Sequence, residues 1–468
     1  MADTPLPTAQ AQHSLKAETL RKGQMLTIAL LLLGYAGYYL CRVHLSITTP
    51  LLIAEFHNQG INKASLGTMI AWGLAFYAAG KFINGSLADY LGGRTLFLTG
   101  MVGAIACTVL FGLSGALPLF TLAWVANRGI QSAGWTGLTK ITSRWFPYSS
   151  YGTAMGLISL SYLFGDFLSR LFLGTLIRKD GLNLGWRSVF FIAAAVLGVI
   201  FVVTLFLLKE SPQDVGAEEP QASPDNVYGE KGDQAAKENL FGLLRPLLVN
   251  PTFWVVCALS FGFTMLRETF NDWIPTYLHE VVKMEEGAAG QASSLFPLFG
   301  GLSVLLAGFV SDRLGRMGRA VIIFGGLILT TPAIFALAHV DFHGSHALPV
   351  VVLGGIAFVM LGPYSFLAGA IGLDFGGKRG GATACGWIDG IGYIGGMLAG
   401  QAIGGIAEHQ GWSAAFVTLT VVAGLTCVAA AVYLFLQSRP VPERAWLEYA
   451  PEPNATATGK EIEIGPEL

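Results

Sequence analysis

The sequence predicts an all-α membrane protein in which twelve transmembrane helices form two six-helix repeats. Three observations support this fold class. Of the 468 residues, 53% are hydrophobic and only 12% are charged, whereas soluble domains carry roughly 25% charged residues. Apolar segments long enough to cross a bilayer recur along the chain. Several short motifs of the first half also return in the second half.

The predicted helices fall into two groups of six, and each helix is an apolar stretch of spanning length. They are expected at 24–56, 64–88, 95–115, 117–143, 150–177 and 187–208, then at 252–281, 290–312, 318–340, 347–373, 380–407 and 411–437. The expected organisation is therefore an N-terminal tail (1–23), an N-terminal bundle (24–208), a polar linker (209–250), a C-terminal bundle (251–437) and a polar tail (438–468).

The distribution of positive charge predicts the orientation of these helices. With both termini in the cytoplasm, 18 of the 28 Lys and Arg residues lie in cytoplasmic segments, 5 lie in external loops and 5 lie within helices. Cytoplasmic loops of membrane proteins carry an excess of Lys and Arg. We therefore expect an integral multi-pass protein, in the inner membrane if the source is bacterial, with both tails and the linker in the cytoplasm.

The two halves share motifs at nearly constant spacing. Residues 85–92 match residues 308–315 at an offset of 223, and residues 153–156 match residues 383–386 at an offset of 230. Offsets this similar indicate a tandem repeat of six helices. Transporters use parallel repeats of this kind and bind their substrate at the interface between them.

Two arginines stand near the middle of the first helix of each half, Arg42 and Arg267. An arginine at mid-bilayer costs at least about 3 kcal/mol, so it should face a water-filled cavity or a partner. The planar guanidinium suits bidentate binding of phosphate or carboxylate. The pair therefore predicts an anion site. The alternative is that each arginine pairs with a nearby carboxylate, such as Glu268 or Asp272 beside Arg267.

Other functional classes find little support in the sequence. The five cysteines all fall in apolar segments, at spacings that match neither a zinc site nor a redox motif. No pair of His, Cys or acidic residues stands at catalytic spacing in the loops, and no basic face suits nucleic acid. We expect a monomer in the lipid bilayer that is not an enzyme and that has no metal, cofactor or nucleic-acid partner.

Two motifs resemble those of the major facilitator superfamily. Residues 85–94, with Asp89 and Arg94, are similar to its loop motif after helix two, and residues 128–134 are similar to its helix-four motif. The resemblance covers roughly residues 24–437. It implies the major facilitator fold, in which Asp89 and Asp312 act as gating and structural elements rather than as substrate ligands.

A finer resemblance points to the organophosphate:phosphate antiporter family, which includes glycerol-3-phosphate and hexose-phosphate transporters. The matching segments are 38–42, 80–82, 131–135, 272–278, 362–363 and 392–396, together with Lys140, Trp145 and Arg267. The resemblance implies a secondary active transporter that exchanges a phosphate ester for inorganic phosphate by alternating access, with Arg42 and Arg267 on the phosphate.

The resemblance also implies a wider set of site residues. The substrate-binding candidates are Arg42, Arg267, Tyr38, Lys81, Gln131, Trp135, Ser161, Tyr364 and Tyr393. The gating and coupling candidates are Asp89, Arg94, Arg128, Asp166, Arg170, Asp272, Asp312 and Asp389. We expect Lys81 to support an inward substrate path, and Lys140 to act mainly as a topology residue near the cytoplasmic end of its helix.

Departures from the family pattern leave two alternatives open. Segment 42–46 also resembles helix one of the anion:cation symporter family, which moves organic carboxylates with protons. Asp166 and Asp389 could then carry the proton, since burial raises a carboxylate pKa, or each could pair with Arg170 or Arg128. The second alternative is a transporter-like sensor of a sugar phosphate. One departure from the family pattern is Ser161, which stands where bacterial glycerol-3-phosphate carriers have a histidine.

Overall fold

A computed structural model describes residues 9–59, 61–177, 182–234, 239–284, 289, 292–339 and 346–439. The described chain up to Gln437 forms one compact unit. Of the predicted tail 438–468, only Ser438 and Arg439 are described.

Twelve helices of 19 residues or more account for most of the described chain. They are α1 (Ala9–Phe56), α2 (Lys63–Leu91), α3 (Gly93–Leu113), α4 (Leu117–Trp145), α5 (Tyr151–Ile177), α6 (Trp186–Leu207), α8 (Pro251–Glu280), α10 (Leu295–Arg313), α11 (Gly318–His339), α12 (Ala347–Ser365), α13 (Gly372–Leu398) and α15 (Trp412–Ser438). Two shorter helices are α7 (Leu240–Val249) and α14 (Gly404–Gln410). The predicted all-helical membrane fold is confirmed.

Ten stretches of the described chain are long and apolar enough to cross a membrane. The number is ten rather than twelve for two reasons. The pair α12 and α13 forms one continuous apolar stretch, Ala347–Leu398. Helix α4 is less apolar because it carries Arg128, Gln131 and Lys140 along its length.

Three helix boundaries differ from the sequence prediction. Helix α1 begins at Ala9 rather than near residue 24, because residues 9–22 are mostly good helix formers such as Ala, Leu, Lys, Gln and Glu. Helix α10 begins at Leu295 rather than at 290. The expected break after 373 lies inside α13, where Gly377 has φ 54° and interrupts the helix. Only glycine adopts this conformation readily.

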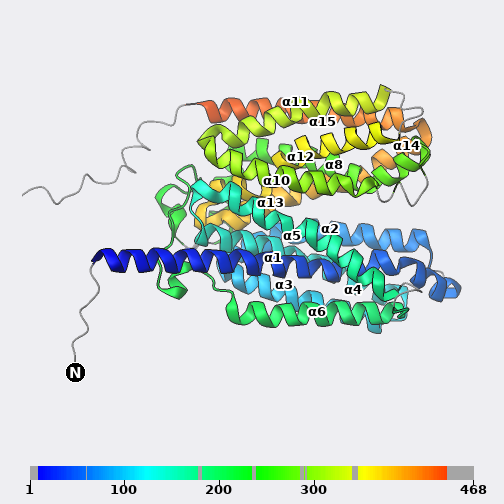
Figure 1. Ribbon diagram of the computed structural model, residues 1–468, viewed down its shortest axis with the longest axis horizontal. Helices are drawn as coiled ribbons and strands as arrows, with labels where there is room; N and C mark the ends of the chain where they lie inside the picture. Colours follow the sequence, from blue (N-terminus) through cyan, green and yellow to red (C-terminus); the bar gives the residue numbers. More distant parts are fainter. Residues whose placement is uncertain are drawn as a thin grey trace, which may run out of the picture. The chain divides into compact units, whose positions relative to one another are not determined.

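The helices of this compact unit form two bundles (Figure 1). Helices α1–α6 build the N-terminal half and helices α8–α15 the C-terminal half. Across the interface, α2 packs along α13 and α5 packs along α10. The sequence repeat relates α2 to α10 and α5 to α13, so the two contacts are equivalent. This arrangement places a pseudo-two-fold axis between the halves.

Each half has its own hydrophobic core. One cluster in the C-terminal half includes Phe253, Phe263 and Phe416. Two clusters include Phe97 and Phe190 of the N-terminal half. The cluster with Phe97 also takes in Ala370, Leu373 and Cys385 of the C-terminal half, so apolar packing crosses the interface there.

Glycines bring the two halves into backbone contact. A Cβ atom on Gly386 of α13 would lie 2.5 Å from the carbonyl oxygen of Lys81 in α2, and one on Gly308 of α10 would lie 2.6 Å from the carbonyl oxygen of Gly152 in α5. Small residues permit this close approach between membrane helices. We call the end of the bundles that carries residues 209–250 the linker end. The glycine contacts lie in the part of the interface nearer to this end.

We expect Gly386→Val to separate α2 from α13, because the new side chain would overlap backbone atoms. Overpacking of this kind costs about 1–3 kcal/mol. Labelling of the buried neighbour Cys385 by a maleimide, followed by peptide mass spectrometry, should become faster in the variant. The matched control is Gly325→Val in α11, where a Cβ meets nothing within 4 Å. Equal labelling of Cys385 in both variants would contradict the close-packing argument.

Candidate functional site

A cavity lies between the two halves near the middle of the helices. It encloses about 460 Å³ of space not filled by protein atoms, open space at its mouth included. Both halves contribute to its wall, which consists of Tyr35, Tyr39, Tyr77, Lys81, Trp135, Ser159, Tyr162, Arg267, Tyr364, Ser365, Ala368, Asp389 and Tyr393. The lining is aromatic and basic, which suits a small organic anion.

Arg42 lies directly beside this cavity and is held by neutral groups. Its Nε donates to Gln131 Oε1 at 3.1 Å, and its two terminal nitrogens donate to the hydroxyls of Tyr39 at 3.2 Å and Tyr77 at 3.3 Å. The guanidinium also lies over both tyrosine rings, 4.6 and 4.9 Å from their centroids. Among the described residues no carboxylate forms an ion pair with Arg42. Its charge is therefore available to a bound anion.

Arg267, the counterpart of Arg42 in the second repeat, differs from Arg42 in having a carboxylate partner. It forms an ion pair with the adjacent Glu268 and lies 4.8 Å from the ring centroid of Tyr364. Its Nε is buried without a hydrogen-bond partner. Asp272, the other candidate partner, is exposed. The carboxylate-pair alternative thus holds for Arg267 and fails for Arg42.

Lys81 and Asp389 form an ion pair across the interface of the halves. Their atoms Nζ and Oδ2 are 2.7 Å apart, and the two side chains are only 1% and 9% exposed. The ammonium also lies 4.8 Å from the ring centroid of Tyr77 and 5.9 Å from that of Trp135. The prediction that Asp389 could pair with Arg128 is wrong, because its partner is Lys81. This pair joins α2 to α13 at the level of the cavity.

Arg128 is buried, and its Nη1 has no hydrogen-bond partner. Its guanidinium lies against the rings of Tyr77 and Trp124, 4.5 and 5.9 Å from their centroids. It forms no ion pair with any described carboxylate. Three buried or half-buried cations, Arg42, Lys81 and Arg128, thus surround the ring of one tyrosine.

Two residues predicted to bind substrate do not reach the cavity. The hydroxyl of Tyr38 donates to the carbonyl of Phe97, and the hydroxyl of Ser161 donates to the carbonyl of Ile158. Residues one or two positions away, such as Tyr39 and Ser159, line the cavity instead. Successive residues of a helix point about 100° apart, so a small error in helix phase selects the wrong side chain.

Seven lining residues were not predicted from the sequence: Tyr35, Tyr39, Tyr77, Ser159, Tyr162, Ser365 and Ala368. Tyr35 and Tyr39 were detectable in principle, since they precede Arg42 by seven and three residues and share its helix face. The remaining predicted substrate residues are near the site: Lys81, Trp135, Arg267, Tyr364 and Tyr393 line the cavity. Gln131 is fully buried behind it and holds Arg42 in place.

At the linker end, two carboxylates join the halves in equivalent ways. Asp89 at the end of α2 accepts hydrogen bonds from the backbone N–H and the hydroxyl of Thr383, at 2.7 and 2.8 Å. Asp312 at the end of α10 accepts them from the backbone N–H groups of Gly152 and Thr153, at 3.0 and 2.7 Å. A carboxylate is stabilised at a helix N-terminus. The pairing of these repeated motifs closes the linker end.

Lys140 takes part in this closure, which corrects the expectation that it is mainly a topology residue. It is 4% exposed. Its ammonium lies 2.8 Å from Asp89 Oδ1 and also donates to the carbonyl of Lys378 in α13. Sequence position near a helix end suggested a solvated lysine, but the opposite half covers it.

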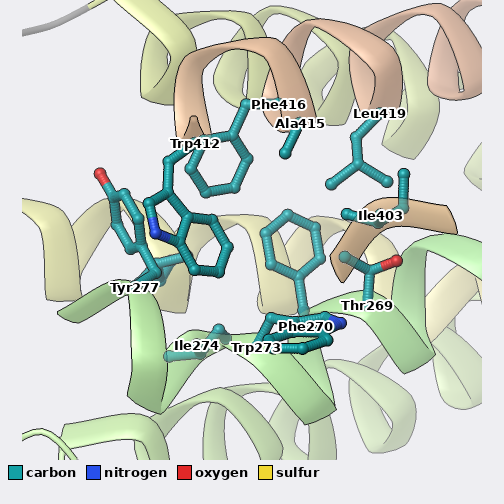
Figure 2. A pocket seen from close by; sticks show the side chains of 11 residues that line it. Thr269, Phe270, Trp273, Ile274, Tyr277, Ile403, Trp412, Ala415, Phe416 and Leu419 are labelled. Atoms are coloured by element: carbon teal, nitrogen blue, oxygen red, sulfur yellow. The ribbon is translucent and has the colours of Figure 1, made fainter. Parts of the chain in front are cut away.

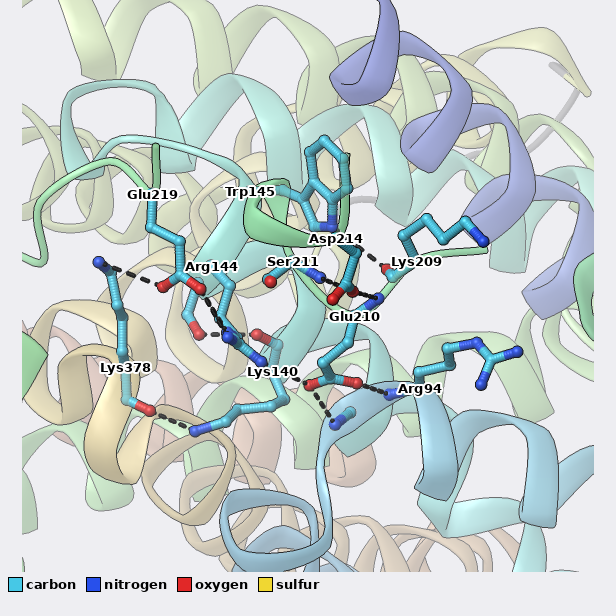
Figure 3. A network of polar contacts seen from close by, with 12 residues as sticks. Arg94, Lys140, Arg144, Trp145, Lys209, Glu210, Ser211, Asp214, Glu219 and Lys378 are labelled. Atoms are coloured by element: carbon cyan, nitrogen blue, oxygen red, sulfur yellow. Dashed lines mark hydrogen bonds and ion pairs between the residues drawn. The ribbon is translucent and has the colours of Figure 1, made fainter. Parts of the chain in front are cut away.

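The linker adds a second set of contacts over the same end (Figure 3). Glu219 accepts two hydrogen bonds from Arg144 of α4, at 3.1 and 2.5 Å, and lies 3.5 Å from Lys378 of α13. Glu210 accepts from the backbone N–H groups that start α3, Gly93 and Arg94, at 2.9 and 2.7 Å. Glu219 therefore connects the two halves through the linker.

The remaining coupling candidates lie apart from the cavity. Arg94 donates to the carbonyls of Leu205 and Leu208 and so fixes the end of α6. Asp166 and Arg170 form an i,i+4 pair at 2.8 Å, with side chains 40% and 55% exposed. This pair neutralises itself, as the sequence analysis allowed.

A separate pocket lies within the C-terminal half, between α8 and α15 (Figure 2). Aromatic side chains such as Phe270, Trp273, Trp412 and Phe416 form most of its wall. No charged side chain contributes to it. Its chemistry does not suit an anion, and we place the candidate site in the cavity between the halves.

Two six-helix bundles with a basic cavity between them define a membrane transport protein. The family model of the Major Facilitator Superfamily matches residues 31–399, and the chain belongs to this superfamily. Within it, the curated relatives correspond to the organophosphate:phosphate antiporter family.

Three relatives illustrate the similarity. A probable hexose phosphate transport protein of Chlamydia trachomatis is 27% identical, with 88% of this chain and 90% of that protein covered. The glycerol-3-phosphate transporter of Bacillus subtilis is 26% identical, over 86% and 90%. The membrane sensor protein UhpC of Escherichia coli is 24% identical, over 93% and 97%.

Among solved structures, FucP in an outward conformation superimposes with a TM-score of 0.69 at 14% sequence identity. The match covers 89% of this chain and 100% of that one. At this identity the likeness establishes the fold alone.

We expect Glu219→Gln to weaken closure of the linker end, because Arg144 and Lys378 would lose their shared counter-charge. A partly buried ionic contact of this kind is worth about 1–3 kcal/mol. Spin labels at the exposed positions Leu91 and Leu314, one in each half, should report longer distances in the variant. The control is Glu218→Gln, whose side chain is 91% exposed and which should match the unsubstituted protein. The same distance distribution in both variants would contradict the role of Glu219.

Proposed function

We propose that this protein is a secondary active transporter of a small organic anion, most simply a phosphate ester such as a sugar phosphate or glycerol phosphate. The ester is exchanged for inorganic phosphate by alternating access. The names of the relatives support the substrate class, since they include hexose phosphate and glycerol-3-phosphate transporters. The observation that carries the proposal is an excess of positive charge around the cavity.

Four cations surround the cavity, and only two carboxylates contact them. Lys81 pairs with Asp389 and Arg267 pairs with Glu268, which leaves Arg42 and Arg128 without a carboxylate among the described residues. A phosphate monoester carries about −1.5 to −2 charges near pH 7. A dianion therefore balances the two uncompensated arginines, and a buried charge is stable only when it is balanced in this way.

The geometry also suggests how the substrate could alter the contact between the halves. The Lys81–Asp389 pair and the ring contact of Tyr77 with Tyr393, whose centroids are 4.9 Å apart, both cross the interface beside the cavity. An anion that approaches Lys81 competes with Asp389 for its ammonium. Binding of the anion would then shift the equilibrium between the closed and open states of the protein. Alternating access requires a shift of this kind.

The linker end is the gate in this proposal, with Asp89, Asp312 and Lys140 as its main contacts and Glu219 as a support. We assign this end to the cytoplasm, along with both tails and the linker 209–250, from the distribution of Lys and Arg. In this proposal, closure of that end assigns the structure to an outward-facing state. The N-terminal bundle 24–208 and the C-terminal bundle 251–437 would then rock as two bodies in a monomer.

We expect Arg42→Lys and Arg267→Lys each to abolish most exchange of labelled inorganic phosphate in proteoliposomes. Lysine keeps the charge but loses the planar fork. Each lost charged hydrogen bond costs about 1.5–3 kcal/mol, or roughly 10- to 100-fold in affinity. The control is Arg21→Lys, an exposed position near the start of α1. Exchange at the unsubstituted rate in either variant would remove that arginine from the site.

The orientation is tested separately by labelling in intact cells. We expect a cysteine introduced at Asp225 in the linker to react with a membrane-impermeant maleimide only after the cells are permeabilised, because the linker is assigned to the cytoplasm. A cysteine introduced at Leu182, which is 65% exposed at the opposite end, should react without permeabilisation. The reverse pattern would invert the topology.

Two other functions have a specific observation in their favour. The relative UhpC is a membrane sensor protein, so a sensor that binds a sugar phosphate with little transport is one candidate. Asp389 lies buried in the cavity wall, where it could carry a proton in a carboxylate symporter. Net transport in proteoliposomes separates carrier from sensor. Acceleration by a pH gradient, without inorganic phosphate inside, would favour symport over exchange.

A further inference from the structure

We propose that Arg42 and Arg128 form a first binding station for the oxyanion of the transported compound, and that Tyr77 separates this station from the deeper cavity. The inference rests on the proposed function and deepens it. It assigns Arg128 a direct contact with the anion instead of a gating role. It also divides the substrate path into two steps within the N-terminal half.

The first argument is the unsatisfied state of the two arginines. Arg128 is 9% exposed, and its Nη1 is buried without a hydrogen-bond partner. Arg42 has five N–H donors, and three of them are directed at Gln131, Tyr39 and Tyr77, all neutral groups. A buried cation without a counter-charge is strongly unfavourable. Both side chains therefore have the capacity, and an energetic reason, to bind an anion.

The second argument is their closeness. The two guanidiniums lie against the same ring, that of Tyr77, with distances to its centroid of 4.9 Å for Arg42 and 4.5 Å for Arg128. Like charges this close repel one another. An oxyanion between them would relieve the repulsion and accept hydrogen bonds from both, as paired guanidiniums commonly do with phosphate.

The third argument is depth in the bundle. Helices α1 and α4 run in opposite directions. Arg42 follows the cavity residue Tyr35 by seven positions, whereas Arg128 precedes the cavity residue Trp135 by seven. Seven residues of α-helix span about 10 Å, at 1.5 Å per residue. Each arginine therefore lies about 10 Å from its cavity residue, in the direction of the end opposite the linker. In the proposed outward-facing state, that end is the side from which the substrate would enter.

Tyr77 stands between this station and the deeper cavity. Its ring contacts both arginines and also Lys81, whose ammonium is 4.8 Å from the ring centroid. Tyr77 lines the cavity, whereas Arg42 and Arg128 do not. Lys81 lies four residues closer to the linker end than Tyr77 on α2 and already has a carboxylate partner. An arriving anion would thus meet the two uncompensated charges first, and the paired Lys81 only after Tyr77 moves.

A neutral hydrogen-bond network fixes the station. Gln131, three residues after Arg128 on α4, accepts from Arg42 Nε and donates to the carbonyl of Cys41 at 2.7 Å. Its amide also donates to Asn127, which donates in turn to the carbonyl of Cys41 at 3.2 Å. This network holds the Arg42 guanidinium without neutralising it, which preserves its charge for the ligand.

The test compares binding and stability in purified full-length protein at constant ionic strength. Inorganic phosphate is the probe, and binding is followed by tryptophan fluorescence and by the thermal midpoint. For Arg128→Gln we expect a loss of roughly 10- to 100-fold in phosphate affinity. Without phosphate, its thermal midpoint should be equal to or above that of the unsubstituted protein, because an unbalanced buried charge has been removed.

Further variants and ligands keep the outcomes distinct. Arg128→Lys should retain part of the affinity, and the control Arg21→Gln, an exposed position, should bind as the unsubstituted protein does. Phosphate binding by Arg128→Gln at full affinity would overturn the station, as would a lower midpoint without phosphate, which indicates a purely structural arginine. If instead a dicarboxylate such as phthalate raises the midpoint in an Arg128-dependent way and phosphate does not, the station stands and phosphate exchange fails.

Discussion

The cost of an unbalanced charge inside the membrane governs the arrangement of this protein. Lys81, Lys140 and Arg267 each meet a carboxylate, and one of these pairs, Lys81 with Asp389, joins the two halves. Arg42 and Arg128 meet none among the described residues. Because isolated cations are costly in hydrocarbon, this uneven distribution is the most informative property of the site. In the proposed function, a bound anion would supply the counter-charge at these two arginines.

The ion pairs have two different roles. At the linker end, Asp89 and Asp312 connect the halves through backbone N–H groups that belong to repeat-related helices. This contact between the halves is thus built twice from one motif, once from each half. At the cavity, Lys81 and Asp389 connect the same two bundles in a place that a bound anion could reach. In the proposed function, anion binding and the contact between the bundles would therefore share a charged group.

Close packing supports this coupling. Each half contains its own hydrophobic core, whereas glycines such as Gly386 and Gly308 dominate the closest contacts between the halves. Aromatic pairs such as Tyr77 with Tyr393 and Phe82 with Trp387 also cross this interface. The linker adds a further connection at one end, where Glu219 bridges α4 and α13.

The sequence by itself determined the fold class, the repeat and most helix positions, and it singled out Arg42 and Arg267 as candidate site residues. Hydropathy, motif spacing and the cost of a buried charge are properties that can be read along a linear chain. Tertiary structure decided which residues meet. Helix phase brought Tyr39 and Ser159 to the cavity in place of Tyr38 and Ser161. The apposition of the halves decided that Lys81 pairs with Asp389, that Lys140 is buried against Asp89, and that Arg128 has no carboxylate. Such pairings join residues from separate helices, and their distances depend on packing that no local pattern encodes.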